Sequence, residues 1–156
     1  MPGPVSSLDW FTACLDYALT VFPQDRISIG LPAYGYDWDL TAGPDGGVGA
    51  TINYADVPPL IAQYGAKVEW DAVAATPWFT YKAKNGHHHE VWFENATSIA
   101  LKAGVAKYKG VGASVWVGGA EWVSGGAGSS AYWDAIYGAA PKNFEPKETE
   151  YEKNNW

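Results

Sequence analysis

RISIGLPAYGYDW, residues 26–38, reads as a buried strand that ends in a cluster of aromatic residues and a carboxylate. Its first half alternates isoleucine and leucine with small residues, which is typical of a strand covered on both faces, and Pro32 ends its hydrogen-bonded pairing. In parallel α/β folds the carboxyl ends of the strands carry the ligand. Three rings are therefore placed to stack on a flat apolar substrate: Tyr34, Tyr36 and Trp38. The alternative is that they pack under a covering loop.

Helical patterns flank this strand on both sides, which favours parallel α/β units. Over residues 8–22 apolar side chains recur at helical spacing, and Pro23 closes the segment. We expect Asp16 off the apolar stripe of this helix and Cys14 in the core, as a buried thiol without a catalytic role. A second helix is predicted after a cap at Asn95, Thr97 or Ser98. Tyr108 is expected in its buried stripe, and Gly110 is expected to end it. The next segment, VGASVWV at 111–117, predicts a second strand covered on both faces.

The segment between these parallel pieces is predicted to be antiparallel. Its Gly-rich residues 39–50 predict a loop, and 54–64 predict a short helix that Gly65 ends. Two strands, 77–83 and 88–94, flank Asn85-Gly86, which is the strongest short hairpin signal. We therefore predict a small antiparallel α+β unit over about 33–93. A short helix near 130–137 completes the packed region, and 141–156 is polar enough to be a linker or tail.

Composition narrows the classes of partner. The formal net charge of -7 argues against nucleic acid and anionic membranes, which both require clustered Lys and Arg. The 156 residues include nine Trp and ten Tyr, more than core packing usually requires. Sugar-binding proteins use such rings to stack on the apolar faces of sugars. No apolar run is long enough to span a bilayer, and no secretory leader is recognisable. The chain is shorter than the roughly 250 residues that a complete (β/α)₈ barrel needs.

No metal or cofactor site is predicted. The run His87-His88-His89 lies on a strand, where alternate side chains point to opposite faces, so its three imidazoles do not converge on one ion. A solvated hairpin is the preferred interpretation of this run.

Taken together, these segments resemble the C-terminal part of a glycoside hydrolase family 18 catalytic domain, a chitinase-like (β/α)₈ barrel. Within that family they resemble especially the bacterial spore-cortex and cell-wall glycosidases. PGPVSSLDW at 2–10 resembles the loop and helix after barrel strand six, residues 26–38 resemble strand seven, and GVGASVWVGGAEW at 110–122 resembles strand eight. TPWFTY at 76–81 and VWFE at 91–94 are similar to the family's chitinase insertion domain. The resemblance implies an α/β fold: a partial TIM barrel over 1–32 and 94–140, an insertion domain over 33–93, and a charged tail or linker over 141–156.

The resemblance also implies site residues. Trp116 would be the strand-eight tryptophan that forms the floor of the sugar subsite at the scissile bond, and Tyr34 and Trp38 would line the same cleft. Trp92 would pack the sheet of the insertion domain. Glu121 would either reach the rim of the cleft or cap the next helix.

One departure from the family bears on activity. Family 18 enzymes carry a DxxDxDxE motif whose final Glu is the general acid, and this sequence contains no such motif. We therefore assign no catalytic residue and expect a fragment of a glycosidase acting on N-acetylglucosamine-containing glycans, chitin or peptidoglycan, which is inactive alone. The alternatives are a non-catalytic carbohydrate-binding or structural module and one half of a split enzyme. The parent is expected to be secreted or associated with the cell wall or spore, and its exposed barrel strands predict self-association.

Overall fold

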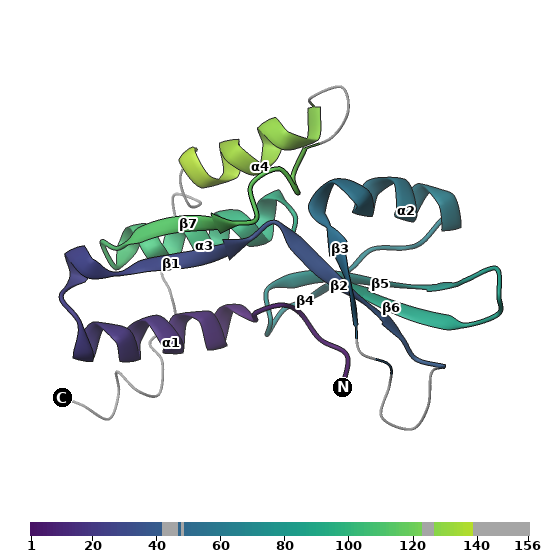
Figure 1. The fold of residues 1–156 in the computed structure, drawn as a ribbon, viewed down its shortest axis with the longest axis horizontal. Coiled ribbons are helices and arrows are strands. Elements are labelled where there is room, and N and C mark those ends of the chain that lie inside the picture. The colour runs from purple at the N-terminus through teal and green to yellow at the C-terminus, as the bar shows by residue number, and fades with distance from the viewer. Residues whose placement is uncertain (42–46, 48, 123–126, 139–156) are drawn as a thin grey trace.

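A computed structural model describes residues 1–41, 47, 49–122 and 127–138 of the chain (Figure 1). The elements in chain order are α1 (Leu8–Val21), β1 (Ser28–Pro32), β2 (Tyr34–Asp39), β3 (Ala50–Asn53), α2 (Val57–Tyr64), β4 (Glu69–Asp71), β5 (Thr76–Lys82), β6 (His88–Trp92), α3 (Ala96–Tyr108), β7 (Gly112–Trp116) and α4 (Ala127–Tyr137). Short 3₁₀ turns, Gln24–Arg26 and Tyr54–Asp56, precede β1 and α2. The strands form two separate sheets.

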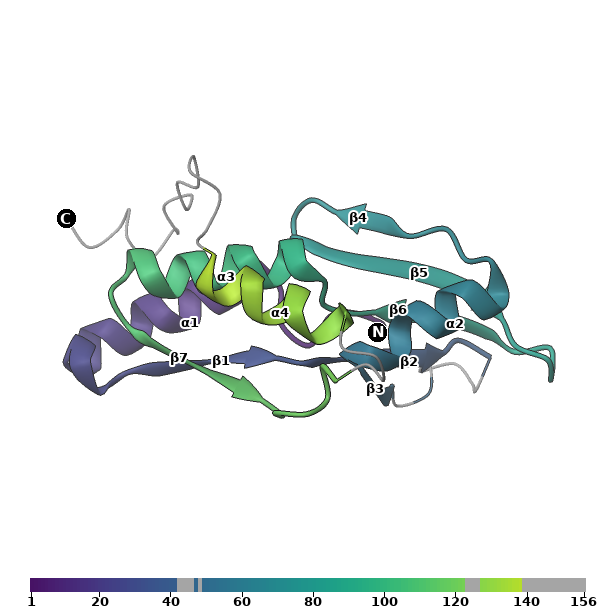
Figure 2. The same cartoon turned by 90° about the horizontal axis from the view of Figure 1, so that it is seen from above.

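The first sheet pairs β1 with β7 in parallel, from Ser28 opposite Gly112 to Pro32 opposite Trp116. Three helices, α1, α3 and α4, lie on one side of this pair, as the view from above shows (Figure 2). Leu31 of β1 is fully buried in the resulting core, with Ile99 and Val105 of α3 and Tyr132 of α4. The predicted parallel α/β arrangement is therefore present, and α3 connects β6 of the second sheet to β7.

The expectation that both strands are covered on both faces is wrong for this structure. Ser28, Gly30, Gly112 and Ser114 are exposed, and the side chain of Trp116 is 70% exposed. Side chains alternate along a strand, so these residues share the face opposite the helices. Among the described residues, only one layer of helices packs on the pair, and the second face is open.

The second sheet has the strand order β3-β2-β6-β5-β4 and is antiparallel throughout. The helix α2 packs on it through Val57, which contacts a small core that contains Phe79 and Val91. The predicted hairpin is confirmed, since β5 and β6 pair on either side of a turn in which Gly86 has φ 91°. Gly65 ends α2 with φ 59°, as its glycine signal predicts. This sheet and the parallel pair lie end to end along the molecule (Figure 1).

The buried face of α1 differs from the predicted stripe. Phe11 and Leu15 are buried as expected, but Asp16 is 5% exposed, because its carboxylate forms an ion pair with Lys109 at 2.8 Å beyond the end of α3. Cys14 is exposed rather than in the core, and Tyr108 on α3 is 68% exposed. The hydrophobic pattern of α1 does not predict that a charged residue is buried. Asp16 is buried because α1 packs against α3.

The helix α3 is held at its start by side chains. Asn95 and Ser98 form a reciprocal capping box, in which the Asn95 side chain accepts from the Ser98 amide at 2.9 Å. One turn further on, Lys102 forms an ion pair with Glu94, and both side chains are almost fully buried. Burial raises the pKa of Glu94, and the ammonium of Lys102 opposes that rise.

Some expectations fall on residues outside the described ranges. The loop predicted over 39–50 is described only in part, and the tail predicted over 141–156 lies entirely outside them. None of the described helices is long and apolar enough to cross a membrane.

Candidate functional site

The carboxyl ends of β1 and β7 meet at Pro32 and Trp116, which are paired across the two strands. The amide of Ala33 donates to the carbonyl of Trp116 at 2.8 Å and fixes the chain where it leaves β1. The peptide bond between Trp116 and Val117 is cis. Trp116 is 70% exposed. Alternation along β7 places its side chain on the same face as Gly112 and Ser114, the face that carries no helix.

An open pocket of about 380 Å³ lies along β1 at this end of the sheet. Its walls are Ile29–Pro32 of β1, Trp10, Phe11 and Cys14 of α1, and the rings of Tyr34 and Trp116. The predicted pair Tyr34 and Trp116 is thus brought together. The contribution of α1, in particular the 61% exposed Trp10, was missed by the sequence analysis, which placed no ligand contact on that helix.

Tyr34 is the main polar group on the aromatic wall of this pocket. Its ring meets that of Tyr36 edge to face, with centroids 5.8 Å apart. Burial raises the pKa of Tyr34, and the neighbouring Tyr36 raises it further. The phenol therefore keeps its proton at neutral pH and can donate a hydrogen bond to a bound ligand.

Trp38 does not line this pocket, although the sequence placed it in the same cleft. The chain turns at Ala33, and Trp38 lies on β2 within the antiparallel sheet, opposite Glu90 of β6. Its indole Nε1 donates to the carbonyl of Gly3 at 3.0 Å, and its ring packs edge to face on Tyr36. Trp38 thus holds the N-terminal segment against the sheet. Val5 and Ser6 of the same segment line the pocket.

Glu121 is 6% exposed and also lies outside this pocket. Its carboxylate accepts a hydrogen bond from the amide of Gly119 at 2.7 Å and another from the indole of Trp133 at 3.2 Å. Glu121 therefore links the turn after β7 to a side chain of α4. Trp92, as expected, packs within the antiparallel sheet, stacked on Trp78 with centroids 5.8 Å apart.

The pocket can bind the apolar face of a ligand, but its lining offers few groups that could take part in catalysis. Its lining includes three large aromatic rings besides Phe11, and no carboxylate or imidazole. Aromatic rings with a hydroxyl donor beside them suit a sugar, which presents C–H groups on one face and hydroxyls at its edge.

A second cluster was missed by the sequence analysis. Asp37 and Asp39 on β2 lie next to His87 and His89 on the β5–β6 hairpin. The His87 imidazole and the amide of Thr41 hold the pKa of Asp39 below its usual value. The alternation D-x-D and H-x-H was visible in the sequence, but only the register of β2 on β6 brings the two pairs together.

The profile of one family, described as Glycosyl hydrolases family 18, matches residues 4–119. Among curated proteins, the chain is 32% identical over 136 residues to the uncharacterized glycosylase YvbX of Bacillus subtilis (strain 168), covering 86% of this chain and 37% of that protein. It is 33% identical over 116 residues to the cortical fragment-lytic enzyme of the same organism, covering 74% of this chain and 27% of that enzyme.

Among solved structures, a chitinase from Chromobacterium violaceum ATCC 12472 superposes with a TM-score of 0.76 at 39% identity. The match covers 87% of this chain and 39% of the chitinase. The chain therefore spans well under half of the length of each of these relatives.

Proposed function

Because the chain belongs to glycosyl hydrolase family 18, we propose that it forms the glycan-lining part of a glycosidase that acts on chitin or peptidoglycan. Two relatives support this substrate class, a chitinase and a cortical fragment-lytic enzyme. The first is named for chitin and the second for the cortical fragments that it lyses. The fold class is α/β, in agreement with the chitinase relatives.

In this proposal β1 and β7 are the last two strands of a (β/α)₈ barrel, and residues 33–93 are the inserted α+β domain. Parallel pairing of β1 with β7, helices on one side only, and an antiparallel sheet between them in sequence support the assignment. The open face then corresponds to the inside of the barrel. Its glycines and serines leave room there for side chains from other strands.

The exposed indole of Trp116, at the carboxyl end of β7 and beside Tyr34, is the observation that carries the proposal. We assign Trp116 as the floor on which a sugar ring stacks, and Tyr34 as a hydrogen-bond donor beside it. Trp38 and Glu121 would act on the same cleft by positioning, Trp38 through the N-terminal segment and Glu121 through the turn that follows Trp116.

Catalysis would require a general acid from outside these residues, because the sequence lacks the DxxDxDxE motif. We therefore propose that the 156-residue chain binds chitooligosaccharides without hydrolysing them.

Calorimetric titration of the chain with N-acetylglucosamine tetramer tests binding. We expect saturable binding that Trp116→Ala weakens by about tenfold or more. Stacking of a nucleobase on one aromatic ring contributes about 1–3 kcal/mol, and about 1.4 kcal/mol corresponds to a tenfold change in affinity. Trp70→Ala is the matched control, because Trp70 is a partly exposed tryptophan on β4, in the other sheet. Equal weakening by both substitutions, or no saturable binding, contradicts the assignment of Trp116. Release of reducing ends from chitin by the native chain contradicts the proposed inactivity.

A further inference from the structure

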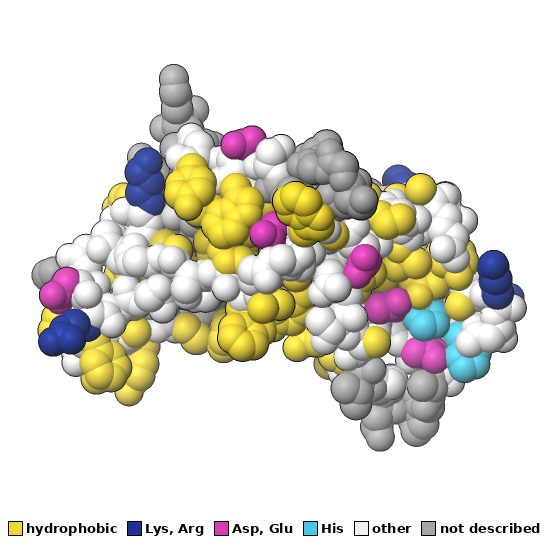
Figure 3. Space-filling model, turned by 45° about the horizontal axis from the view of Figure 1, so that its top comes forward, with side chains coloured by type: hydrophobic (Ala, Val, Ile, Leu, Met, Phe, Trp, Pro, Cys, Tyr) yellow, Lys and Arg dark blue, Asp and Glu magenta, His cyan; other side chains and the backbone are white. Residues whose placement is uncertain are grey.

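We propose that Asp39, His87 and His89 form a binding site for a divalent transition ion of the zinc type. The site is separate from the aromatic pocket and lies at the hairpin end of the antiparallel sheet. The histidines lie beside carboxylates on the surface at that end of the molecule (Figure 3).

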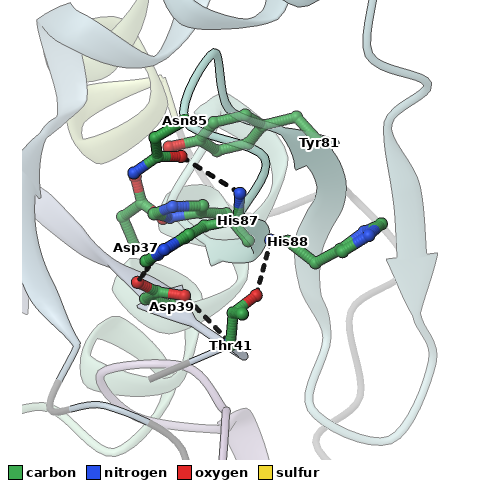
Figure 4. Close-up of polar contacts among 8 residues, drawn as sticks. Asp37, Asp39, Thr41, Tyr81, Asn85, His87 and His88 are labelled. Atoms are coloured by element: carbon green, nitrogen blue, oxygen red, sulfur yellow. Dashed lines mark hydrogen bonds and ion pairs between the residues drawn. The ribbon is translucent and has the colours of Figure 1, made fainter.

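Strand register creates this convergence. Asp39 is paired directly with His89 across β2 and β6, and His87 is two residues before His89, so its side chain lies on the same side. His88 occupies the alternate position, and its side chain points away from the cluster (Figure 4). The expectation that the three histidines do not converge as a run therefore holds, but two of them converge with an aspartate from the neighbouring strand.

The donor atoms are close enough to share an ion after small side-chain rotations. One ligand atom from each of Asp39, His87 and His89 lies within 4.8 Å of the other two. The Nδ1 atom of His87 is 2.7 Å from Asp39 Oδ2, and all three residues are partly buried. Partial burial reduces competition from water while leaving a path for an ion.

Neighbouring groups orient these ligands, as the outer partners of metal ligands do. Asp37 Oδ1 contacts His89 Nδ1 at 2.8 Å, and Tyr81 donates to Asp37 Oδ2 at 2.6 Å. The Tyr81 ring also stacks on His89, with centroids 4.7 Å apart. On the other side, the amide of Thr41 donates to Asp39 Oδ1 at 2.9 Å.

The chemical type of the three ligand atoms indicates which metal ions can bind. Two imidazole nitrogens and one carboxylate oxygen are ligands that zinc accepts, with a water in the fourth position. Calcium and magnesium prefer oxygen ligands only, so they are not expected to bind here. A bound ion would join the end of β2 to the β5–β6 hairpin, which indicates a structural role.

The test uses the full chain without an affinity tag, stripped of metal with EDTA and then titrated with zinc chloride by calorimetry. We expect one zinc ion per chain, binding that is at least about tenfold weaker in His87→Ala and in Asp39→Asn, and native affinity in His88→Ala. Calcium chloride is expected to give no heat of binding.

Thermal unfolding gives a second readout that separates loss of the site from loss of the fold. Zinc is expected to raise the melting temperature of the native chain and of His88→Ala, but not that of His87→Ala. Melting of each variant in EDTA shows whether it is folded. Absence of stoichiometric binding to the native chain, or equal weakening by His88→Ala and His87→Ala, overturns the proposal.

Discussion

At the scale of single residues, Lys102 and Glu94 form an ion pair that water scarcely reaches, with 0% and 1% of their side chains exposed. Such a pair is costly to break, because the remaining charge has no solvent to stabilise it. Glu94 lies between the end of β6 and the start of α3, and Lys102 lies in the second turn of α3. The pair is therefore positioned to fix the junction between the two sheets.

We predict that Lys102→Met lowers the free energy of unfolding by about 3–5 kcal/mol, measured by urea titration with circular dichroism. The double variant Glu94→Leu/Lys102→Met removes both charges and should recover most of that loss. A single variant as stable as the native chain would contradict the importance of the pair.

The loss in Lys102→Met should also depend on pH. Burial raises the pKa of Glu94, and the ammonium that opposes the rise is absent in this variant. A carboxyl whose pKa is raised on folding stabilises the fold below its unfolded pKa, and that contribution is lost as the pH rises through the folded value. The deficit should therefore grow as the pH is raised above the usual value of 4.5. A deficit that is constant with pH would mean that the pKa of Glu94 is not raised in the folded variant.

At the scale of elements, β2 and β6 approach each other more closely than a side chain allows at one position. A Cβ atom on Gly35 would lie 2.1 Å from the carbonyl oxygen of Trp92 and 2.8 Å from the Cα atom of Phe93. Both are backbone atoms of the neighbouring segment, so a methyl group cannot be accommodated by a change of rotamer.

We predict that Gly35→Ala destabilises the chain by about 1–3 kcal/mol, as overpacking does, measured by urea unfolding. Gly30→Ala is the control, because a Cβ on Gly30 meets nothing within 4 Å. Similar losses in both variants would indicate that the effect of Gly35→Ala does not come from contact with β6.

Local signals explain which elements the sequence predicts well. The hairpin at Asn85-Gly86 and the end of α2 at Gly65 each depend on a few adjacent residues, and each is present in the structure. Burial is different, because it depends on which elements pack together. Asp16 is buried against Lys109 at the end of α3, a contact that no pattern within α1 contains. Cys14 is exposed, although the pattern within α1 predicts that it is in the core.

The candidate sites divide in the same way. Tyr34 and Trp116 meet because the carboxyl ends of parallel strands share an edge, which the sequence predicts once both strands are recognised. Trp38 is outside the pocket because the chain enters a second sheet after Ala33. The cluster of Asp39, His87 and His89 depends on strand register, which hydrophobic alternation alone leaves undetermined here.

At the scale of the whole molecule, one face of the parallel pair is open to solvent among the described residues. Among the described residues, β1 and β7 each have one strand neighbour, so each keeps an edge with unpaired backbone groups. The open face beside these edges carries Trp116, and the next residue, Val117, is exposed as well.

We predict that the isolated chain self-associates through this face at micromolar concentration, detected by sedimentation velocity over a dilution series. Ser114→Lys places a charge on the open face of β7 and should shift the chain toward monomer. Thr80→Lys, at an exposed position of β5 in the other sheet, should leave association unchanged. A native chain that sediments as a monomer throughout the series would contradict the prediction.

The chain enters and leaves the antiparallel sheet at neighbouring positions, which affects the order in which the two sheets fold. Tyr36, near the start of β2, is paired with Trp92, the last residue of β6. Pairing β1 with β7 in an unfolded chain must close a long loop, and the entropic cost of closure increases with loop length. Once β2 and β6 have paired, the two ends of the segment 33–93 are close together. The loop that remains to be closed between β1 and α3 is then short. The antiparallel sheet should therefore form before the parallel pair, and it can remain intact when the pair opens.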